Sequence, residues 1–388
     1  MSALVRAVAI TGLAILALVF IWRAGAAAST DPTCVAGAGF VPQFCVNVPS
    51  ALTRRDLPAT LAPVATAGTE LRVESAIPVS VIQRVATELD RATVRVERVF
   101  GRTFSERPRV LLYATPESFA RGIADLFGYS PERARLAASR YAGVVDQTTL
   151  TVAVDLQAAA RDNIEGLLAH ELVHVMIRDV AGRDAALPAW FEEGLATVIQ
   201  REDAMPPDTD ALLARSLVAN GVVSLDQLAT IPDWHRTFSR VGRAQYAVAA
   251  DAVRELEARI GNDGVVSLLD AVGKGARFED AYAQLGDGTF AEFTAAFRDD
   301  RSHHAGLAVS AGRDAAGNVR WTLYAFPPDS TVLVRIWDER GYDVIFTITT
   351  DQTGMFRGSF GSTAPAGRYA ILARSGFASA TAELRTAP

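Results

Sequence analysis

The chain has 388 residues, too long for one typical domain and long enough for two or three. Hydrophobic residues make up 49% of it and charged residues 21%, which is typical of a folded protein and excludes wholesale disorder. The net charge of −6 argues against the clustered basic surface that nucleic-acid binding requires, so we expect no nucleic acid as a partner.

The N-terminal segment, residues 1–28, is a predicted export signal. Arg6 precedes an apolar run of 16 residues, from Ala7 to Trp22, and Arg23 closes it. The run is slightly long for the core of a signal peptide and slightly short for a membrane span, and small residues that suit cleavage follow it. A cleaved signal peptide and an uncleaved signal anchor in the membrane both stay open. In either case we expect an exported chain, secreted or anchored to the outer face of the cytoplasmic membrane.

Residues 29–68 are predicted to form a linker outside the cytoplasm. Cys34 and Cys45, the two cysteines of the chain, lie in a stretch that contains Gly and Pro. A close pair of cysteines outside the cytoplasm most simply forms one disulfide, and no histidine lies nearby to complete a zinc site. Residues 46–68 are rich in Pro, Ala and Thr without clear periodicity, which is typical of a linker that holds the next domain away from a membrane.

A regular pattern of secondary structure begins near residue 69. Apolar residues recur at helical spacing from Val79 to Phe100, and Gly101 ends that helix. A second helix is predicted to begin at Pro116. Strands are predicted at residues 71–73, 109–113, 141–145 and 150–155, and a turn at 146–147 joins the last two.

The following region is predicted to be mainly helical. Its clearest helix spans residues 162–178, where Asp162 and Glu165 make a start like a capping box. Pro188 stands near the first position of the next helix, which extends to Ile199. Further helices are predicted at residues 209–219, 242–260, 263–272, 277–284 and 288–299.

Residues 305–388 differ in pattern from the helical region. Apolar and polar residues alternate in short runs that Pro, Gly and Asp turns separate, as in residues 331–337 and 368–374. Six or seven such strands predict a β-sandwich. The segment resembles bacterial immunoglobulin-like modules and has no cluster of catalytic residues. We therefore expect an interaction or spacer domain that can present a surface to a ligand.

A metal-binding motif lies on the clearest predicted helix, at His170-Glu171-Leu172-Val173-His174. Positions i and i+4 share one face of a helix, so both imidazoles can reach one ion. Glu171 follows the first histidine, which places its carboxylate beside a water on that ion and not on the ion itself. A pair of surface histidines would not explain why the rest of this helix is so apolar, because buried histidine and glutamate side chains need partners.

Glu193 is the predicted third metal ligand. A catalytic zinc site uses three protein ligands and keeps one position open. Glu193 lies 19 positions after His174, enough for a turn and an antiparallel helix to bring it back. Gly194 would then allow two helices to approach closely. Glu192 points about 100° away and is predicted either to face solvent or to support the ligands from behind.

The segments HELVH and PAWFEEGLA, with 18 residues between His174 and Glu193, resemble the gluzincin peptidases. In particular they are similar to the bacterial peptidase MA-like group, which is related to M1-family aminopeptidases. The resemblance extends over about residues 69–300 and implies an α+β, thermolysin-like catalytic domain, which we place at residues 69–302. It also implies one zinc ion per chain, held by His170, His174 and Glu193.

Two features bear on how far this resemblance reaches. M1-family aminopeptidases carry a GxMEN strand whose glutamate binds the free amine of the substrate, and the corresponding stretch here, Ala142–Asp146, has no glutamate. The resemblance therefore does not imply aminopeptidase specificity. Gluzincins often use a tyrosine or histidine to stabilise the oxyanion. Tyr246 either has this role or is a tyrosine that packs between helices.

Other side chains near the motif have simpler alternatives. Thr197 and Asp179 are predicted either to support a metal-bound histidine or to be ordinary surface or capping residues. Trp190 is predicted to belong to the core and not to a substrate platform. The remaining histidines lack metal-binding spacing and are expected to be exposed: His235, His303 and His304.

The predicted function is hydrolysis of peptide bonds by a zinc-dependent endopeptidase outside the cytoplasmic membrane. Its substrate would be a peptide or protein whose carbonyl is attacked by a metal-activated water, with Glu171 as the general base that later protonates the leaving amine. The alternative is a surface binding or scaffold protein that keeps a metallopeptidase fold and presents its C-terminal domain to a ligand. The complete ligand set favours the enzyme, because a binding protein has no need of Glu171.

Overall fold

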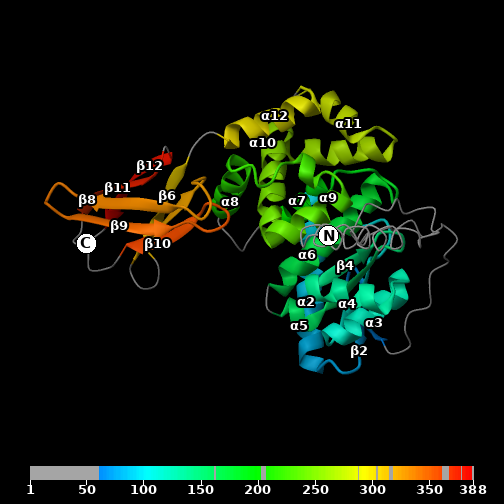
Figure 1. The fold of residues 1–388 in the computed structure, drawn as a ribbon. Coiled ribbons are helices and arrows are strands. Elements are labelled where there is room, and N and C mark those ends of the chain that lie inside the picture. Colours follow the sequence, from blue (N-terminus) through cyan, green and yellow to red (C-terminus); the bar gives the residue numbers. More distant parts are fainter. Residues whose placement is uncertain are drawn as a thin grey trace, which may run out of the picture. The chain divides into compact units, whose positions relative to one another are not determined.

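The computed structural model (Figure 1) describes residues 61–160, 163–201, 207–286, 288–302, 305–313, 318–360, 367–376 and 378–386. The predicted export signal and the pair Cys34 and Cys45 lie outside these residues. No helix in the described part of the chain is both long enough and apolar enough to cross a membrane. The fold is of the mixed α+β class, with helices around one sheet first and a C-terminal β-sheet region after them.

The first sheet has five strands in the order β1-β2-β3-β5-β4. The strands β2, β3 and β5 are parallel to one another, whereas β1 and β4 are antiparallel strands at the two edges. Their bounds are β1 (Leu61–Val64), β2 (Glu70–Glu74), β3 (Arg109–Tyr113), β4 (Gly143–Asp146) and β5 (Thr151–Asp155).

The strand β1 corrects the predicted linker, which extended to residue 68. Residues 61–64 pair with residues 71–74 of β2, and the Leu61 side chain is buried. A strand of four residues that contains Pro63 has too little periodicity to be recognised in sequence. Proline is tolerated there because an edge strand needs no N–H on its outer side. The predicted domain boundaries, 69–302 and 305–388, stay predictions.

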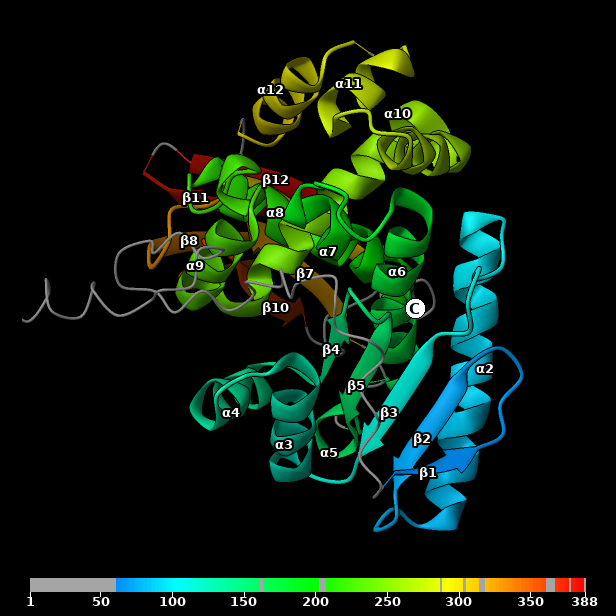
Figure 2. The ribbon, with the colours of Figure 1, turned by 90° about the vertical axis from the view of Figure 1, so that its right-hand side faces the viewer.

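Helices cover both faces of this sheet (Figure 2). They are α2 (Val79–Phe100), α3 (Pro116–Phe127), α4 (Pro131–Arg140) and α6 (Ile164–Ala181). The helices α2 and α6 share a core with Val110 and Leu112, while α3 and α4 pack with Leu111 and Tyr113. Successive residues of a strand point to opposite faces, so burial on both sides explains why β3 is a nearly unbroken apolar run.

Most elements predicted for this part are confirmed. The strands at 71–73, 109–113 and 150–155 are present, as are the helix from Val79 to Phe100 and the helix that begins at Pro116. The helix α4 was not predicted. Its buried side chains are alanines, which leave only a weak apolar stripe in the sequence.

A second group of helices follows. These helices are α5 (Leu156–Ala159), α7 (Ala189–Gln200), α8 (Pro207–Ala219), α9 (Ile231–Val241), α10 (Gln245–Gly273), α11 (Phe278–Gln284) and α12 (Phe290–Arg301). Gly261, with a φ of 73°, interrupts the helical path of α10 at the point where the sequence predicts two helices. The helix α9 was not predicted, although its apolar residues recur at helical spacing: Ile231, Trp234, Phe238 and Val241.

The start of α6 also differs from the prediction. Its N-cap residue is Asn163, which makes no side-chain capping bond, so the predicted capping box is wrong. Glu165 forms an ion pair with Arg95 of α2 instead. Asp162 lies outside the described residues. The pairing partner on α2 is far away in the sequence, so a local capping pattern could not reveal it.

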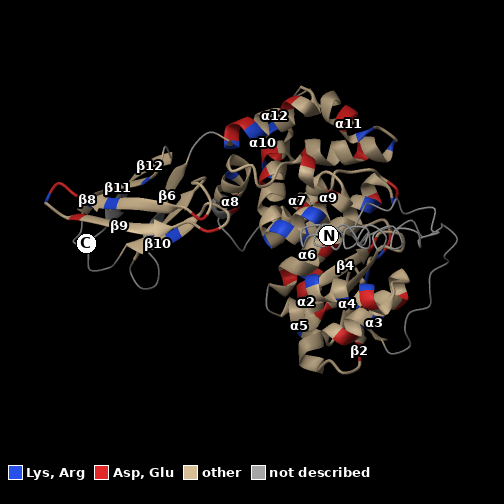
Figure 3. Ribbon diagram, in the orientation of Figure 1, with Lys and Arg blue, Asp and Glu red and all other residues tan. Residues whose placement is uncertain are grey.

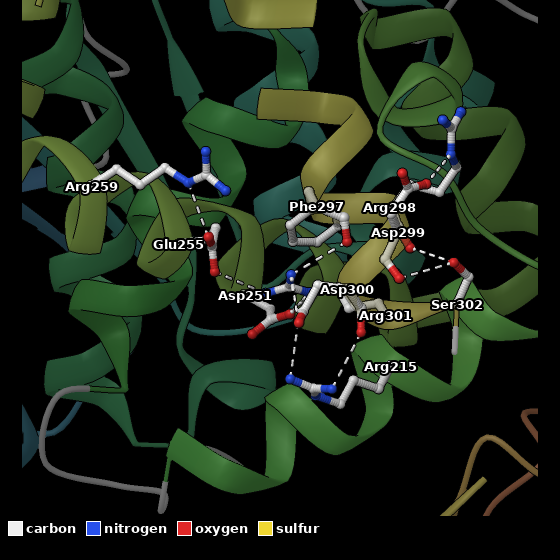
Figure 4. A network of polar contacts seen from close by, with 10 residues as sticks. All are labelled: Arg215, Asp251, Glu255, Arg259, Phe297, Arg298, Asp299, Asp300, Arg301 and Ser302. Atoms are coloured by element: carbon white, nitrogen blue, oxygen red, sulfur yellow. Dashed lines mark hydrogen bonds and ion pairs between the residues drawn. The ribbon is translucent and has the colours of Figure 1, made fainter. Parts of the chain in front are cut away.

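Charged side chains are spread over the helices (Figure 3), and one group of them joins α12 to α10 and α8 (Figure 4). Arg301 is buried, its Nε donates to Asp251 Oδ2 at 2.5 Å, and its Nη2 lies 3.6 Å from Glu255 Oε2. Arg215 of α8 lies 3.1 Å from the carboxylate of Asp300. Burial raises the pKa of Asp251, and the charge and hydrogen bond of Arg301 oppose this rise. Removing Asp251 would leave the buried charge of Arg301 without its nearest partner, so this pair fixes α12 on α10.

The C-terminal region consists of two antiparallel sheets, in the orders β10-β7-β6 and β12-β11-β8-β9. The two sheets enclose one core, to which Trp321 and Leu323 contribute from one side and Val334 and Ile371 from the other. Seven strands are described here, which agrees with the predicted six or seven. The strands are β6 (Gly306–Arg313), β7 (Val319–Tyr324), β8 (Thr331–Trp337), β9 (Asp343–Thr349), β10 (Phe356–Phe360), β11 (Gly367–Ser375) and β12 (Ala378–Thr386).

Candidate metal centre

The helix α6 is buried on almost all sides. It packs against α2, α7 and the edge strand β4, and the side chains of Leu168, Leu172 and Met176 are inaccessible to solvent. A helix that is apolar all round belongs to the interior of a protein. His170, Glu171 and His174 are buried on the same helix. Polar groups in such surroundings are stable only with partners, and the two histidines share one partner, Glu193 on α7.

The side chains of His170, His174 and Glu193 converge on one point. The Nε2 atoms of the two histidines are 3.3 Å apart, and Glu193 Oε2 lies 3.5 Å from Nε2 of His170 and 3.8 Å from Nε2 of His174. Two zinc–ligand bonds of about 2.0–2.2 Å at a tetrahedral angle put their ligand atoms about 3.3–3.6 Å apart. Two imidazoles and a carboxylate therefore fit a zinc ion in chemistry and in spacing.

The protonation states of these groups also suit a metal. Burial lowers the pKa of His174 to about 4, so this imidazole is neutral at pH 7. Burial would lower the pKa of His170, but the hydrogen bond to Glu193 and the charges of Glu171 and Glu193 raise it. Burial would raise the pKa of Glu193, yet the two histidines lower it. Metal ligation needs a deprotonated carboxylate and neutral imidazoles, and a cation would replace the proton that Glu193 favours on His170.

Glu171 lies beside these ligands, against the edge strand β4. A Cβ atom built on Gly143 would lie 2.5 Å from Oε1 of Glu171, so the backbone of β4 passes directly over this carboxylate. A glycine is needed there because any side chain would collide with Glu171. Burial raises the pKa of Glu171 to about 7, the charge of His170 opposes the shift, and that of Glu193 adds to it. This carboxyl group can therefore exchange a proton near neutral pH.

Glu192 does not face solvent, so that alternative of the prediction is wrong. Both of its carboxylate oxygens accept hydrogen bonds from Nη2 of Arg178, at 2.5 and 2.6 Å, and both side chains are buried. Arg178 stands one helical turn after His174, and Glu192 precedes Glu193. Burial raises the pKa of Glu192 and the charge of Arg178 opposes the rise. The pair joins α6 to α7 next to the ligands and so supports them from behind.

Gly194 has the role predicted for it. A Cβ atom at this position would lie 2.4 Å from the carbonyl oxygen of Ala249, so α7 and α10 touch through their backbones. The close approach next to Glu193 is confirmed, and the neighbouring helix is α10. The position of the third ligand is thus fixed from the side of α10 as well as through the pair Arg178 and Glu192.

Thr197 and Asp179 were predicted either to support a metal-bound histidine or to be ordinary residues. Among the described residues, their hydrogen bonds are to other groups than a histidine. Thr197 is buried, and its Oγ1 donates to the backbone oxygen of Glu193 at 2.7 Å. Asp179 accepts hydrogen bonds from Ser105, at 2.8 Å for the backbone N, and so holds the loop after α2. Thr197 therefore braces the turn of α7 that carries Glu193, and Asp179 has a structural role away from the ligands.

The prediction that His235 is exposed is wrong. This residue of α9 is buried, and its Nδ1 lies 3.1 Å from the hydroxyl oxygen of Tyr141. Burial lowers the pKa of His235 to about 4, while the charge of Glu193 pulls the other way, so the ring lies within the field of the ligand. Burial and the charge of Glu193 both raise the pKa of Tyr141. This pair could not be read from the sequence, because its two residues lie 94 positions apart. His303 and His304 lie outside the described residues.

Tyr246 lies near the ligands, with its ring centroid 6.3 Å from that of His170. It also packs edge-on against Trp234, with 4.9 Å between centroids, which is the helix-packing contact. Burial raises its pKa further above the ordinary value of tyrosine, so the hydroxyl stays protonated at neutral pH. A catalytic role for Tyr246 stays a prediction. Trp190 is confirmed as a core residue, stacked with Phe290 and Phe293.

Comparisons with known proteins give little further information. No family model matches the chain, and no curated protein does so either. Among solved structures, the chain is similar to an aminopeptidase N family protein from Idiomarina loihiensis, with 11% sequence identity and a TM-score of 0.38. The match covers 77% of this chain and 68% of that one.

Proposed function

We propose that this chain is a zinc-dependent peptidase of the endopeptidase type, with His170, His174 and Glu193 as metal ligands and Glu171 as the general base. The observation that carries the proposal is the convergence of three donor atoms within 4.8 Å of one another beside a buried carboxylate that is not one of them. A structural zinc site is closed by four protein ligands and has no use for such a neighbour. The three donors and Glu171 together match a catalytic site.

The proposed mechanism assigns proton transfer to Glu171. Zinc, when bound, would polarise a substrate carbonyl and lower the pKa of a water to about 7. The ionised carboxylate of Glu171 accepts a proton from the attacking water. It then returns this proton to the leaving amine nitrogen, which restores the carboxylate for the next cycle. Burial raises the pKa of this carboxyl group, so it can hold the proton that it takes from water until the leaving amine accepts it.

Endopeptidase activity is favoured by the strand beside Glu171. In the stretch Ala142–Asp146 the carboxylate is that of Asp146, and it is buried. It accepts hydrogen bonds from the backbone N of Thr148 at 3.0 Å and from Oγ1 of Thr149 at 2.6 Å. This carboxylate therefore stabilises the turn between β4 and β5 and is not presented to a free amine. Internal peptide bonds of a peptide or protein are the proposed substrate.

The proposal also covers where the chain acts and to which domain types its two regions belong. The apolar run from Ala7 to Trp22 supports export, so hydrolysis would take place outside the cytoplasmic membrane. The gluzincin-like and immunoglobulin-like assignments of the two regions rest on the sequence resemblance. Both agree with the α+β class of the structure and with its C-terminal pair of antiparallel sheets.

The test is the variant Glu171→Gln, assayed with a library of peptides. The amide cannot accept the proton, so we expect turnover to fall about 10²–10⁴-fold while zinc content stays near one ion per chain. Glu106→Gln is a suitable control, because the side chain of Glu106 is 72% exposed. The turnover of this variant should equal that of the wild type. Full activity of Glu171→Gln would contradict the mechanism.

The same assay separates the binding or scaffold alternative. A chain that binds zinc with high affinity through the three ligands but cleaves no peptide in its wild-type form would favour that alternative. In that case Glu171→Gln and the wild type would differ in neither zinc content nor activity.

A further inference from the structure

The strand β9 carries apolar side chains on both of its faces. Among the described residues, Ile345 is 59% exposed, Leu333 on the neighbouring β8 is 46% exposed and Val344 is 39% exposed. Val344 faces the same side as Ile336, its buried partner on β8, and Ile345 faces the opposite side with Arg335. This cluster makes the β8–β9 end of the sheet the part of the C-terminal region where apolar surface is most open to solvent.

The outer edge of β9 is open to another strand. In the sheet order β12-β11-β8-β9 it is the last strand, and the described residues show it paired with β8 alone. The opposite end of the sheet differs, because β12 there lies against β6 of the second sheet. Proteins usually protect an edge strand with a lysine, a proline or a bulge. The sequence DVIFTIT of β9 contains no lysine or proline, and its register with β8 is regular over all seven pairs.

We propose that β9 pairs in antiparallel fashion with β9 of a second copy of this chain, around a two-fold axis at Phe346. In that register Phe346 faces its own counterpart, and Val344 of each copy faces Ile348 of the other. The three inner positions would form one continuous apolar row next to Trp321, whose ring centroid lies 6.5 Å from that of Phe346. A two-fold axis normal to the sheet keeps inner faces with inner faces, so the sheet of one copy continues into that of the other.

The outer face of β9 is self-complementary in the same register. Ile345 faces Thr347, and both are β-branched residues, which are well suited to neighbouring strands. Asp343, the single charged residue of β9, faces Thr349, so no like charges meet across the new edge. A slip by one residue would bring inner positions against outer ones and lose both rows. The continuous apolar row and the absence of facing like charges favour a second copy of this chain as the occupant.

The test is the association state of the full chain, purified in a mild detergent and followed by sedimentation equilibrium. We expect the wild type to dimerise. The double variant Ile345→Lys/Thr347→Lys places two pairs of like charges directly opposite each other, and its dissociation constant should rise by at least about tenfold. The variant Ile345→Glu/Thr347→Glu should be weakened in the same way. An equimolar mixture of the lysine and glutamate variants should dimerise again, because opposite charges then face each other.

A matched control is Val79→Lys on α2, where the valine is 69% exposed and lies far from β9 in the sequence. It should dimerise like the wild type, and circular dichroism should show that every variant is folded. Dimerisation of the lysine variant at wild-type strength would overturn the proposal. So would a wild type that stays monomeric, including one whose β9 binds a strand of a different protein. Because no metal ligand is involved, these outcomes do not depend on the proposed peptidase activity.

Discussion

The helical region and the C-terminal sheets differ in where they place charge. Among the described residues before 302, buried side chains include His170, Glu171, Arg178, Glu192 and Arg301. In the described residues after 305, buried polar side chains include Thr350, which follows β9, and Asp338, which pairs with Arg340 between β8 and β9. Figure 3 shows the same contrast, with many charged residues on the helices and few on the strands. Burying a charge costs stability unless it is paired, so it is retained where a particular geometry has to be held. Under the proposed function, the helical region would carry the chemistry and the C-terminal sheets would contribute surface.

The largest effect on the helical region is expected from removing one of the proposed metal ligands. His174→Ala leaves two donors, so we expect zinc binding to be lost and peptide hydrolysis to fall to background. Zinc at about a thousand times its dissociation constant should stabilise the wild type by about 4 kcal/mol and leave this variant unaffected. Competition with a fluorescent chelator and thermal unfolding with and without zinc measure both effects. Tight binding of one zinc ion by the variant would show that the ligand set is different.

A large loss of stability is expected when the ion pair behind the ligands is broken. Glu192→Ala leaves the guanidinium of Arg178 buried without its carboxylate, which should cost about 3–5 kcal/mol in the free energy of unfolding. The double variant Arg178→Met/Glu192→Leu removes both charges and should recover most of that loss. Urea unfolding of the three proteins measures the difference. A loss below about 1 kcal/mol for Glu192→Ala would mean that the pair contributes little.

A smaller effect, confined to the chemistry, is expected at Gly143. The Gly143→Ala methyl group would meet the carboxylate of Glu171 at 2.5 Å and push it aside. A displacement of about 1 Å costs about 100-fold in rate when a catalytic group is misplaced. Zinc affinity should stay within a few-fold of the wild-type value, because the ligands are on α6 and α7. Peptide hydrolysis under saturating substrate, measured beside a chelator competition, checks both; an unchanged kcat would contradict the position assigned to Glu171.

The smallest effect is expected in the core of the C-terminal sheets, away from the proposed site. Ile336→Val removes one methyl group from the core between the C-terminal sheets and should cost about 0.5–1.5 kcal/mol. Neither kcat nor zinc affinity should change, since nothing in that core takes part in the site. Thermal unfolding and the same activity assay provide the measurement. A fall in kcat here would mean that the sheets contribute to catalysis after all.

The convergence of the three candidate metal ligands could be predicted from the sequence because it depends on spacing along two neighbouring helices. His170 and His174 share a helix face by spacing alone, and Glu193 lies on the next helix at a distance that one turn allows. The strands β2, β3 and β5 of the first sheet and the long helix α2 were also predicted, because each has a clear apolar pattern, whereas β1 was not. Gly194 was recognised for the same reason, as a small residue beside a predicted ligand.

The residues around the ligands could not be predicted, because each depends on a contact that is remote in the sequence. Whether Glu192 faces solvent is decided by Arg178, which lies on another helix. His235 was expected to be exposed because it lacks metal-binding spacing, yet it is buried and its Nδ1 lies 3.1 Å from the hydroxyl oxygen of Tyr141. Gly143 was predicted only to be part of a strand, although its lack of a side chain makes room for Glu171.

The pair Arg178 and Glu192 has a further consequence for how a metal would be acquired. It links α6 to α7 through protein atoms alone, so the spacing of the two helices does not depend on an ion. In small zinc domains the metal drives folding, and the chain is unfolded without it. Here the donors would be preorganised, and little conformational entropy would be lost when the ion arrives. Loading should then be governed by access to the buried ligands, and the apoprotein should remain folded and ready to exchange one divalent ion for another.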